Sequence, residues 1–159
     1  MDNYSVYTSV PKLLKVGDTM LAETPDGLVK QILWPKHCVW HTEGVQLWPT
    51  LHRPLTAVYT YKGTEPTIEC YSVFGNPDRD YCTGLHDLLQ GFGVDSLYFA
   101  GVAEDVCVGQ SALAALALGY QVTVIEDATC GVSVEDTASM KEAILKAGGE
   151  YLHSDMILT

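Results

Sequence analysis

The second half of the chain alternates between short apolar runs and longer segments with helical periodicity. Residues 96–101 form an apolar run after a glycine-rich turn, which is typical of a strand buried inside a sheet. Hydrophobic residues then recur at every third or fourth position over residues 105–118, which predicts a helix that stops at Gly119. Residues 121–125 are rich in β-branched side chains and predict a second strand, followed by a polar loop.

The same alternation continues on both sides of this unit. The serine at position 133 and the acidic residues after it open a helix over residues 134–146, and residues 151–152 predict a last short strand. Upstream, residues 55–61 predict a strand and residues 80–90 a helix. Because strands that alternate with helices indicate βαβ units, we expect an α/β fold with a parallel sheet and helices on both faces, a three-layer arrangement.

The first 50 residues have a different pattern, because prolines and glycines interrupt every apolar run. Residues 16–21 and 28–33 are long enough for short extended pieces, and no helix is predicted. We therefore expect residues 1–33 to be an irregular or divergent part of one domain that spans residues 1–159. A long irregular stretch in a compact domain indicates a functional loop region or a missing piece of scaffold.

Composition and charge exclude several classes of protein. The 159 residues are 47% hydrophobic and 18% charged, which excludes an intrinsically disordered chain. The net charge is −11 and no basic cluster is present, so a nucleic-acid partner is not expected. No apolar run reaches the length of a membrane span and the first residues lack a signal-peptide pattern, so we expect a cytoplasmic protein without a membrane partner. The five scattered cysteines predict free thiols in a reducing compartment.

Three residues are candidates for chemistry, and each has a plainer interpretation. Cys107 falls in the first turn of the helix after the strand at 96–101, where backbone N–H groups favour a thiolate, although a small buried residue fits equally well. Lys62 follows the predicted strand at 55–61 and can lower the pKa of a neighbouring thiol, although an exposed loop lysine is the simpler explanation. His37 is one histidine, and zinc usually needs three or four protein ligands, so a structural hydrogen-bonded role is the alternative.

Taken together, these residues lie in motifs whose order resembles one known family, the isochorismatase-like cysteine hydrolases, and within it the nicotinamidase/pyrazinamidase group. The resemblance extends over residues 34–152. The motifs that carry it are W-P-K-H-C-V-W-H-T-E-G at 34–44, Y-K-G at 61–63, Y-S-V-F at 71–74, G-V-A-E-D-V-C-V-G-Q-S-A-L-A-A at 101–115 and D-A-T-C-G-V-S at 127–133.

The resemblance implies a role for each matching residue. Cys107 is implied as the nucleophile that forms a thioester with a carboxamide, with Lys62 beside it. The N–H groups of Ala103 and Cys107 are implied as the oxyanion hole, after a cis bond between residues 102 and 103. Trp34 and Tyr71 are implied to line a pocket for a flat aromatic ring.

The resemblance also implies a metal site and shows where this sequence departs from the family. His37 is implied as a ligand of zinc or another divalent metal. The family's D-x-Q-x-x-F strand, which supplies an aspartate base, and its D-x-H metal motif are both absent from residues 1–33, so the ligand set is incomplete and the first strands of the fold are missing. Glu104 occupies a position where the family usually has threonine.

These observations lead to one principal hypothesis and two alternatives. The principal one is a nicotinamidase-like enzyme that converts nicotinamide, a small aromatic amide, to nicotinate and ammonia. The first alternative is a catalytically impaired or truncated relative that acts by binding or by forming homo-oligomers through an uncovered sheet edge. The second is a hydrolase of another small amide or a carbamoyl compound.

Overall fold

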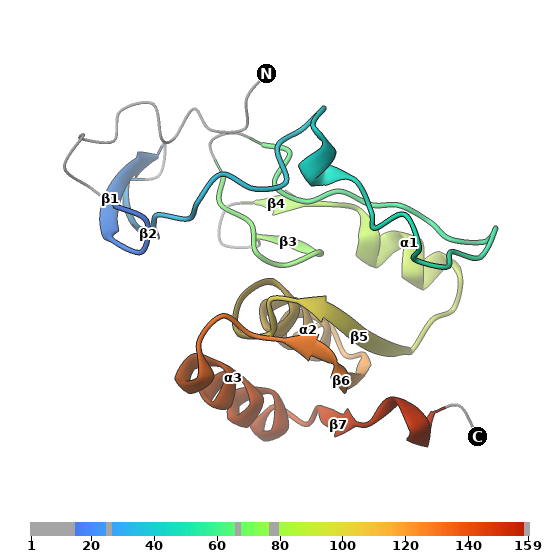
Figure 1. The fold of residues 1–159 in the computed structure, drawn as a ribbon. Coiled ribbons are helices and arrows are strands. Elements are labelled where there is room, and N and C mark those ends of the chain that lie inside the picture. Colours follow the sequence, from blue (N-terminus) through green and yellow to red (C-terminus); the bar gives the residue numbers. More distant parts are fainter. Residues whose placement is uncertain (1–14, 25–26, 66–67, 77–79, 158–159) are drawn as a thin grey trace. The chain divides into compact units, whose positions relative to one another are not determined.

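The structure is a computed structural model that describes residues 15–24, 27–65, 68–76 and 80–157. The chain divides into two compact units (Figure 1). The first contains residues 1–59 and 63–69, and the second contains residues 60–62 and 70–159. Within the described residues, no helix is both long enough and apolar enough to cross a membrane.

An antiparallel hairpin is the regular part of the first unit. Strand β1 (Thr19–Thr24) pairs with β2 (Gly27–Ile32) along its whole length. The extended pieces predicted at residues 16–21 and 28–33 are therefore the two strands of one hairpin, the first of them displaced along the chain. The sequence prediction took Pro25 and Gly27 only as interruptions, although a Pro-Asp-Gly run between two apolar segments favours a turn that would pair them.

Beyond the hairpin, the first unit is held by turns and side-chain contacts. A short 3₁₀ turn, η2, spans Glu43–Val45. The side chain of Gln31 donates a hydrogen bond to the carboxylate of Glu69, 2.7 Å away, and so ties the hairpin to a segment 38 residues further along the chain.

The strand predicted at residues 55–61 is wrong, because this segment is irregular in the structure. The side chains of Leu55, Val58 and Tyr61 are exposed. Residues of this type fit a pleated, half-buried surface, but a strand forms only where a neighbour supplies the other half of the ladder. Within the described residues, no strand pairs with this segment.

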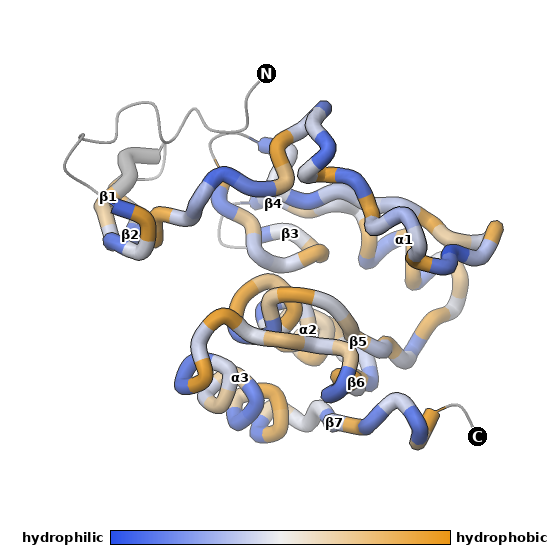
Figure 2. Tube along the Cα trace, viewed as in Figure 1, coloured by the Kyte–Doolittle hydropathy of each residue, from blue (hydrophilic) through white to orange (hydrophobic). Residues whose placement is uncertain are grey.

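A parallel three-stranded sheet forms the centre of the second unit. The strands are β5 (Ser96–Val102), β6 (Gln121–Cys130) and β7 (Glu150–Leu152), in that spatial order. Both neighbouring pairs are parallel, which confirms the prediction from the strand–helix alternation. Strand β6 is longer than predicted, because it continues through the polar residues after its hydrophobic first half (Figure 2).

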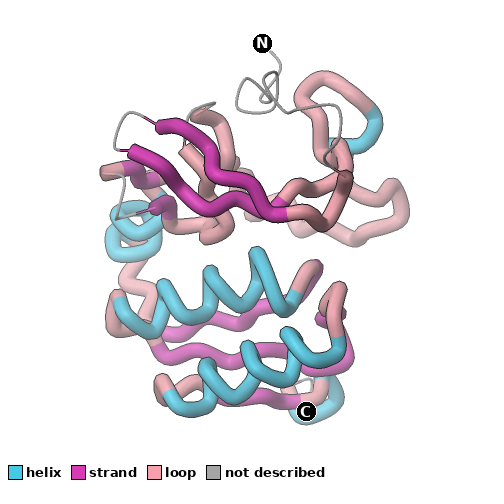
Figure 3. The backbone as a smooth tube through the Cα atoms, turned by 90° about the vertical axis from the view of Figure 1, so that its left-hand side faces the viewer, coloured by secondary structure: helices cyan, strands magenta, loops and turns pink. Residues whose placement is uncertain are grey.

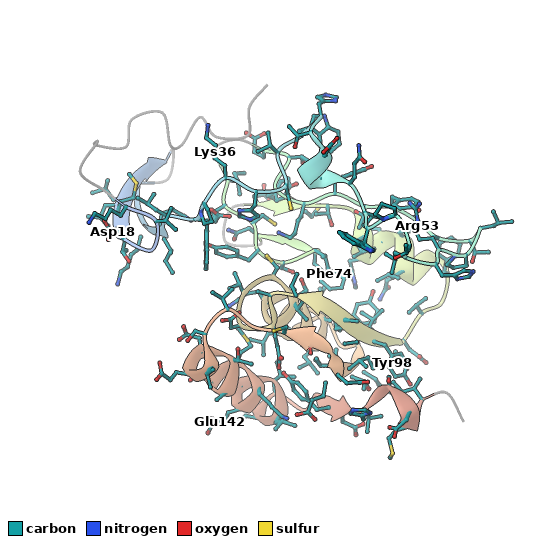
Figure 4. The ribbon with its side chains drawn as sticks, in the orientation of Figure 1. Asp18, Lys36, Arg53, Phe74, Tyr98 and Glu142 are labelled. Atoms are coloured by element: carbon teal, nitrogen blue, oxygen red, sulfur yellow. The ribbon has the colours of Figure 1, made fainter. Side chains whose placement is uncertain are left out.

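The helices α2 (Gly109–Ala117) and α3 (Val134–Lys146) cover one face of this sheet (Figure 3). The bounds of α3 are those predicted, and the Ser133 side chain caps it by accepting a hydrogen bond from the Asp136 N–H at 3.2 Å. The second helical layer of the expected three-layer fold is not seen among the described residues. On the opposite face of β5, Tyr98 is 60% exposed (Figure 4).

The core of the second unit lies between the sheet and these helices. Its central members are buried side chains of β6, α2, α3 and the segments before them, namely Phe74, Ala112, Ala115, Tyr120, Val122, Val124 and Ile144. The ring of Phe74 (Figure 4) stacks on that of Tyr120 with centroids 6.0 Å apart. Burying each large side chain of this kind contributes roughly 1.5–3 kcal/mol, so this layer holds the unit together.

Two helix predictions need correction at their ends. The helix predicted at residues 80–90 is α1 (Leu85–Gly91), because the residues before it form β4 (Tyr81–Cys82), which pairs antiparallel with β3 (Gly75–Asn76). The helix predicted at 105–118 is in fact a π-helical turn followed by α2. The pair of two-residue strands β3 and β4 and the π-helical turn before α2 are too short to produce a recognisable periodicity in the sequence.

Candidate functional site

The turn that carries Cys107 follows β5 directly. The bond between Val102 and Ala103 is cis, which confirms the expectation from the resemblance. A π-helical turn, η4 (Glu104–Val108), then leads without interruption into α2. The half-buried Cys107 therefore lies in the first turn of a helix that follows the carboxyl end of a strand of the parallel sheet, as the sequence predicts.

The backbone of this turn converges on one carbonyl. The N–H groups of Val106 and Val108 both donate to the Ala103 carbonyl oxygen, at 3.1 and 3.0 Å. The N–H of Cys107 lies between them, at a helix start, where backbone N–H groups lack intrahelical acceptors. N–H groups in this position can stabilise a negatively charged oxygen, the chemistry required of an oxyanion hole.

Ser111 links this turn to the segment that carries Tyr71. Its hydroxyl donates to the Cys107 carbonyl oxygen at 2.6 Å and accepts from the Val73 N–H at 3.0 Å. Sequence reasoning missed Ser111, because a serine among alanines on an apolar helix looks like an ordinary small residue. The only signal was its spacing, since positions 107 and 111 are one helical turn apart and share a face.

Lys62 contacts the other end of the same segment. Its ammonium group donates to the Cys70 carbonyl oxygen at 3.3 Å, and the Cys70 thiol donates to the Ser72 carbonyl oxygen at 3.1 Å. Lys62, Tyr71 and Cys107, three of the sequence candidates, thus belong to one compact unit and are connected through the segment 70–74.

A second side chain holds the Cys107 turn from the β6 side. The carboxylate of Asp105 accepts hydrogen bonds from the N–H groups of Val132 and Ser133, at 2.8–3.0 Å. Gly131 is required beside them, since a Cβ there would collide with the Thr137 side chain. The end of β6 and the start of α3 are therefore fixed to the Cys107 turn by a carboxylate that the sequence suggested only as a helix-start residue.

Glu104, the residue that departs from the family pattern, is buried in the same turn. The hydroxyl of Tyr151 in β7 is also buried, and within the described residues it has no hydrogen-bond partner of good geometry. Burial of this hydroxyl, together with the neighbouring Glu104 carboxylate, raises the pKa of Tyr151 above its usual value. The Glu104 side chain is therefore directed into the protein toward β7.

Trp34 and His37 belong to the first unit. The His37 ring nitrogen Nδ1 lies 2.6 Å from the Pro35 carbonyl oxygen, and the side chain is exposed. Among the residues that the structure describes, no three histidine, cysteine or acidic side chains are grouped as a metal ion would require. One exposed histidine supplies too few ligands for a metal centre, although a bond between Nδ1 and a carbonyl is of the kind that metal-ligating histidines make.

A family comparison places these features among known proteins. The isochorismatase domain model matches residues 16–155. The chain is 43% identical over 130 residues to a nicotinamidase of Escherichia coli (strain K12), a match that covers 81% of this chain and 61% of the relative. The chain thus spans about 60% of the length of the curated relatives that it matches first.

Solved structures give the same picture. A nicotinamidase/pyrazinamidase of Acinetobacter baumanii superimposes with a TM-score of 0.86 at 30% identity, covering 99% of this chain and 74% of that one. A pyrazinamidase of Pyrococcus horikoshii in complex with zinc has a TM-score of 0.68 at 36% identity, with coverages of 76% and 63%. A protein of L. infantum in complex with nicotinate has a TM-score of 0.73 at 33% identity, with coverages of 77% and 61%.

Proposed function

We propose that this chain, which belongs to the isochorismatase domain family, is an amide hydrolase of the nicotinamidase type that converts nicotinamide to nicotinate and ammonia. The observation that carries the proposal is the position of Cys107, in a helix-start turn at the carboxyl end of β5 and hydrogen-bonded through Ser111 to the segment of Tyr71. Ligands of open α/β sheets bind at this edge.

The proposed reaction has two steps. The Cys107 sulfur attacks the carboxamide carbon, and the tetrahedral oxyanion is held by the N–H groups of Ala103 and Cys107. The carbon–nitrogen bond breaks and the nitrogen leaves as ammonia with the thiol proton, which leaves a thioester. Water then cleaves the thioester, returns a proton to the sulfur and releases nicotinate.

The remaining candidates have supporting roles in this proposal. Lys62 supplies a positive charge to the site, and Tyr71 holds the pyridine ring. The two units act as one hydrolase domain over residues 1–159. No step runs through a metal, because no three histidine, cysteine or acidic side chains of the described residues are grouped as a metal ion would require. A cytoplasmic location and self-association stay predictions.

The test is ammonia release from nicotinamide. We expect wild-type protein to release ammonia and Cys107→Ala to lose this activity, because the thioester cannot form without the sulfur. Cys82→Ala is the matched control, since Cys82 is an exposed free cysteine of β4 and its loss leaves the rate unchanged. Equal rates from wild type and Cys107→Ala would overturn the cysteine mechanism.

A second candidate function is binding without turnover. It is favoured by the sequence, which has no D-x-Q-x-x-F base motif in residues 1–33. A cysteine without a partnered base is only a few per cent thiolate at neutral pH. Calorimetric binding of nicotinate by a wild-type protein that releases no ammonia would favour this second function.

A further inference from the structure

We propose that Ser111 is a positioning residue that holds the segment carrying Tyr71 at a fixed distance from the turn carrying Cys107. The inference rests on the proposed function, in which Tyr71 contacts the substrate ring and Cys107 attacks the carboxamide. Ser111 itself does not touch the substrate in this proposal, because its side chain is 1% exposed.

The hydroxyl of Ser111 is fully used by two backbone groups. Its single proton is donated to the Cys107 carbonyl oxygen at 2.6 Å, and a lone pair accepts from the Val73 N–H at 3.0 Å. A serine that bonds the carbonyl four residues earlier is common in helices and needs no functional explanation. The bond from Val73 is the unusual one, because it joins the helix to a segment 38 residues away.

The segment 70–74 is anchored at both ends, and Ser111 is the anchor on the cysteine side. Lys62 donates to the Cys70 carbonyl oxygen, and the Thr83 hydroxyl donates to the Val73 carbonyl oxygen at 2.6 Å. Those two bonds fix the segment to its own surroundings. The Val73–Ser111–Cys107 bridge alone, among these bonds, connects it with the nucleophile turn.

This connection matters because the proposed reaction requires a fixed distance between the ring-binding Tyr71 and the nucleophile Cys107. An amide held by its ring reacts only if its carbon lies within near-attack distance of the sulfur, and a misplacement of about 1 Å can cost about a hundredfold in rate. Removing the hydroxyl would leave the half-buried Val73 N–H without this partner and free the segment to shift.

The experiment compares Ser111→Ala with Ser139→Ala as the matched control. Ser139 makes the same bond to a helix carbonyl four residues earlier, 2.9 Å to Glu135, but it is exposed on α3 and has no second bond of this kind among the described residues. Three quantities are measured in each: kcat/KM for nicotinamide, the rate of Cys107 alkylation by iodoacetamide, and the hydrogen-exchange protection of the Val73 amide.

We expect Ser111→Ala to lower kcat/KM at least about tenfold, with alkylation changed less than about twofold, since alkylation needs only the thiol. Ser111→Thr, which keeps the hydroxyl, restores turnover, and Ser139→Ala matches wild type. A kcat/KM for Ser111→Ala within about twofold of wild type would overturn the proposal, and so would parallel losses of turnover and alkylation.

Failure of the proposed function gives a different result. If wild-type protein releases no ammonia, the nicotinamidase proposal fails, and the bridge is decided by hydrogen exchange alone. Loss of Val73 protection in Ser111→Ala but not in Ser139→Ala supports the bridge. The same protection in all three proteins refutes it.

Discussion

At the scale of single residues, the position of Cys107 is set by side chains as much as by the strand before it. The sequence could predict its place at a strand end and helix start, because that depends only on local periodicity. It could not predict the bonds of Ser111 and Asp105, because their partners lie 38 and 27 or 28 residues away. Contacts over such distances follow from how the segments pack.

Glu104 and Tyr151 provide a pH-dependent test at this scale. Burial raises the pKa of Tyr151 most, followed by Glu104, with Glu126 a smaller cause. We expect Glu104→Gln to lower the pKa of Tyr151 while leaving it above its ordinary value. Ultraviolet titration of tyrosinate, with Tyr151→Phe as the reference, measures the shift.

The raised pKa of Tyr151 also determines how the free energy of unfolding changes with pH. A raised pKa means that the folded chain favours the neutral phenol. The contribution of Tyr151 to folding stability is therefore complete below about pH 10 and declines as the pH rises further. Glu126→Gln is the matched control and should move the pKa of Tyr151 less. A larger shift from Glu126→Gln would contradict the assignment of Glu104 as the nearer charge.

At the scale of elements, segments with a periodic hydrophobic pattern could be predicted, and strands that depend on a distant partner could not. Helix α3 matches its predicted bounds, since its apolar spacing and start residues lie within one stretch. The segment 55–61 has the composition of a strand but no neighbour among the described residues, and β3 with β4 is too short to leave a pattern. Ladders depend on partners that a local window does not contain.

The packing of α2 on α3 can be tested at Gly109. Alanine in place of a helical glycine usually stabilises by up to about 1 kcal/mol. A Cβ at Gly109, however, would collide with the Met140 side chain and the Glu104 carbonyl oxygen. We therefore expect Gly109→Ala to lower the free energy of unfolding by about 1–3 kcal/mol, measured by urea denaturation.

The control for this substitution is Gly91→Ala at the end of α1. Nothing lies within 4 Å of a Cβ there, so the substitution should be neutral or stabilising. If Gly109→Ala is as stable as Gly91→Ala, Met140 and the π-helical turn move aside for the new Cβ without lowering the free energy of unfolding, which would contradict this prediction.

At the scale of the whole molecule, the chain spans about 60% of the length of its first curated relatives. The fold class was predictable because the strand–helix alternation lies in residues 96–152. The hairpin of β1 and β2 was not predicted, although the Pro25-Asp26-Gly27 run in the sequence is typical of a turn between paired strands. Motif order carried the family assignment, which the domain match confirms.

Metal content is the test at this scale. A single histidine supplies one of the three or four ligands that zinc usually needs, so we expect clearly less than one zinc or iron per chain by elemental analysis. His37→Ala should leave that content unchanged. A stoichiometric metal that resists dialysis against a chelator would show that further ligands complete a site.

Asp105 and Ser111 hold the Cys107 turn from two sides, and the place of their partners in the chain has a consequence. The hydrogen bonds that Asp105 accepts from the start of α3 and that Ser111 accepts from Val73 all lie within residues 70–159. Sequence change in the first 59 residues therefore leaves these bonds intact. The surroundings of the Cys107 turn are therefore built from the second unit alone, and a variant of the first unit can be made without altering them.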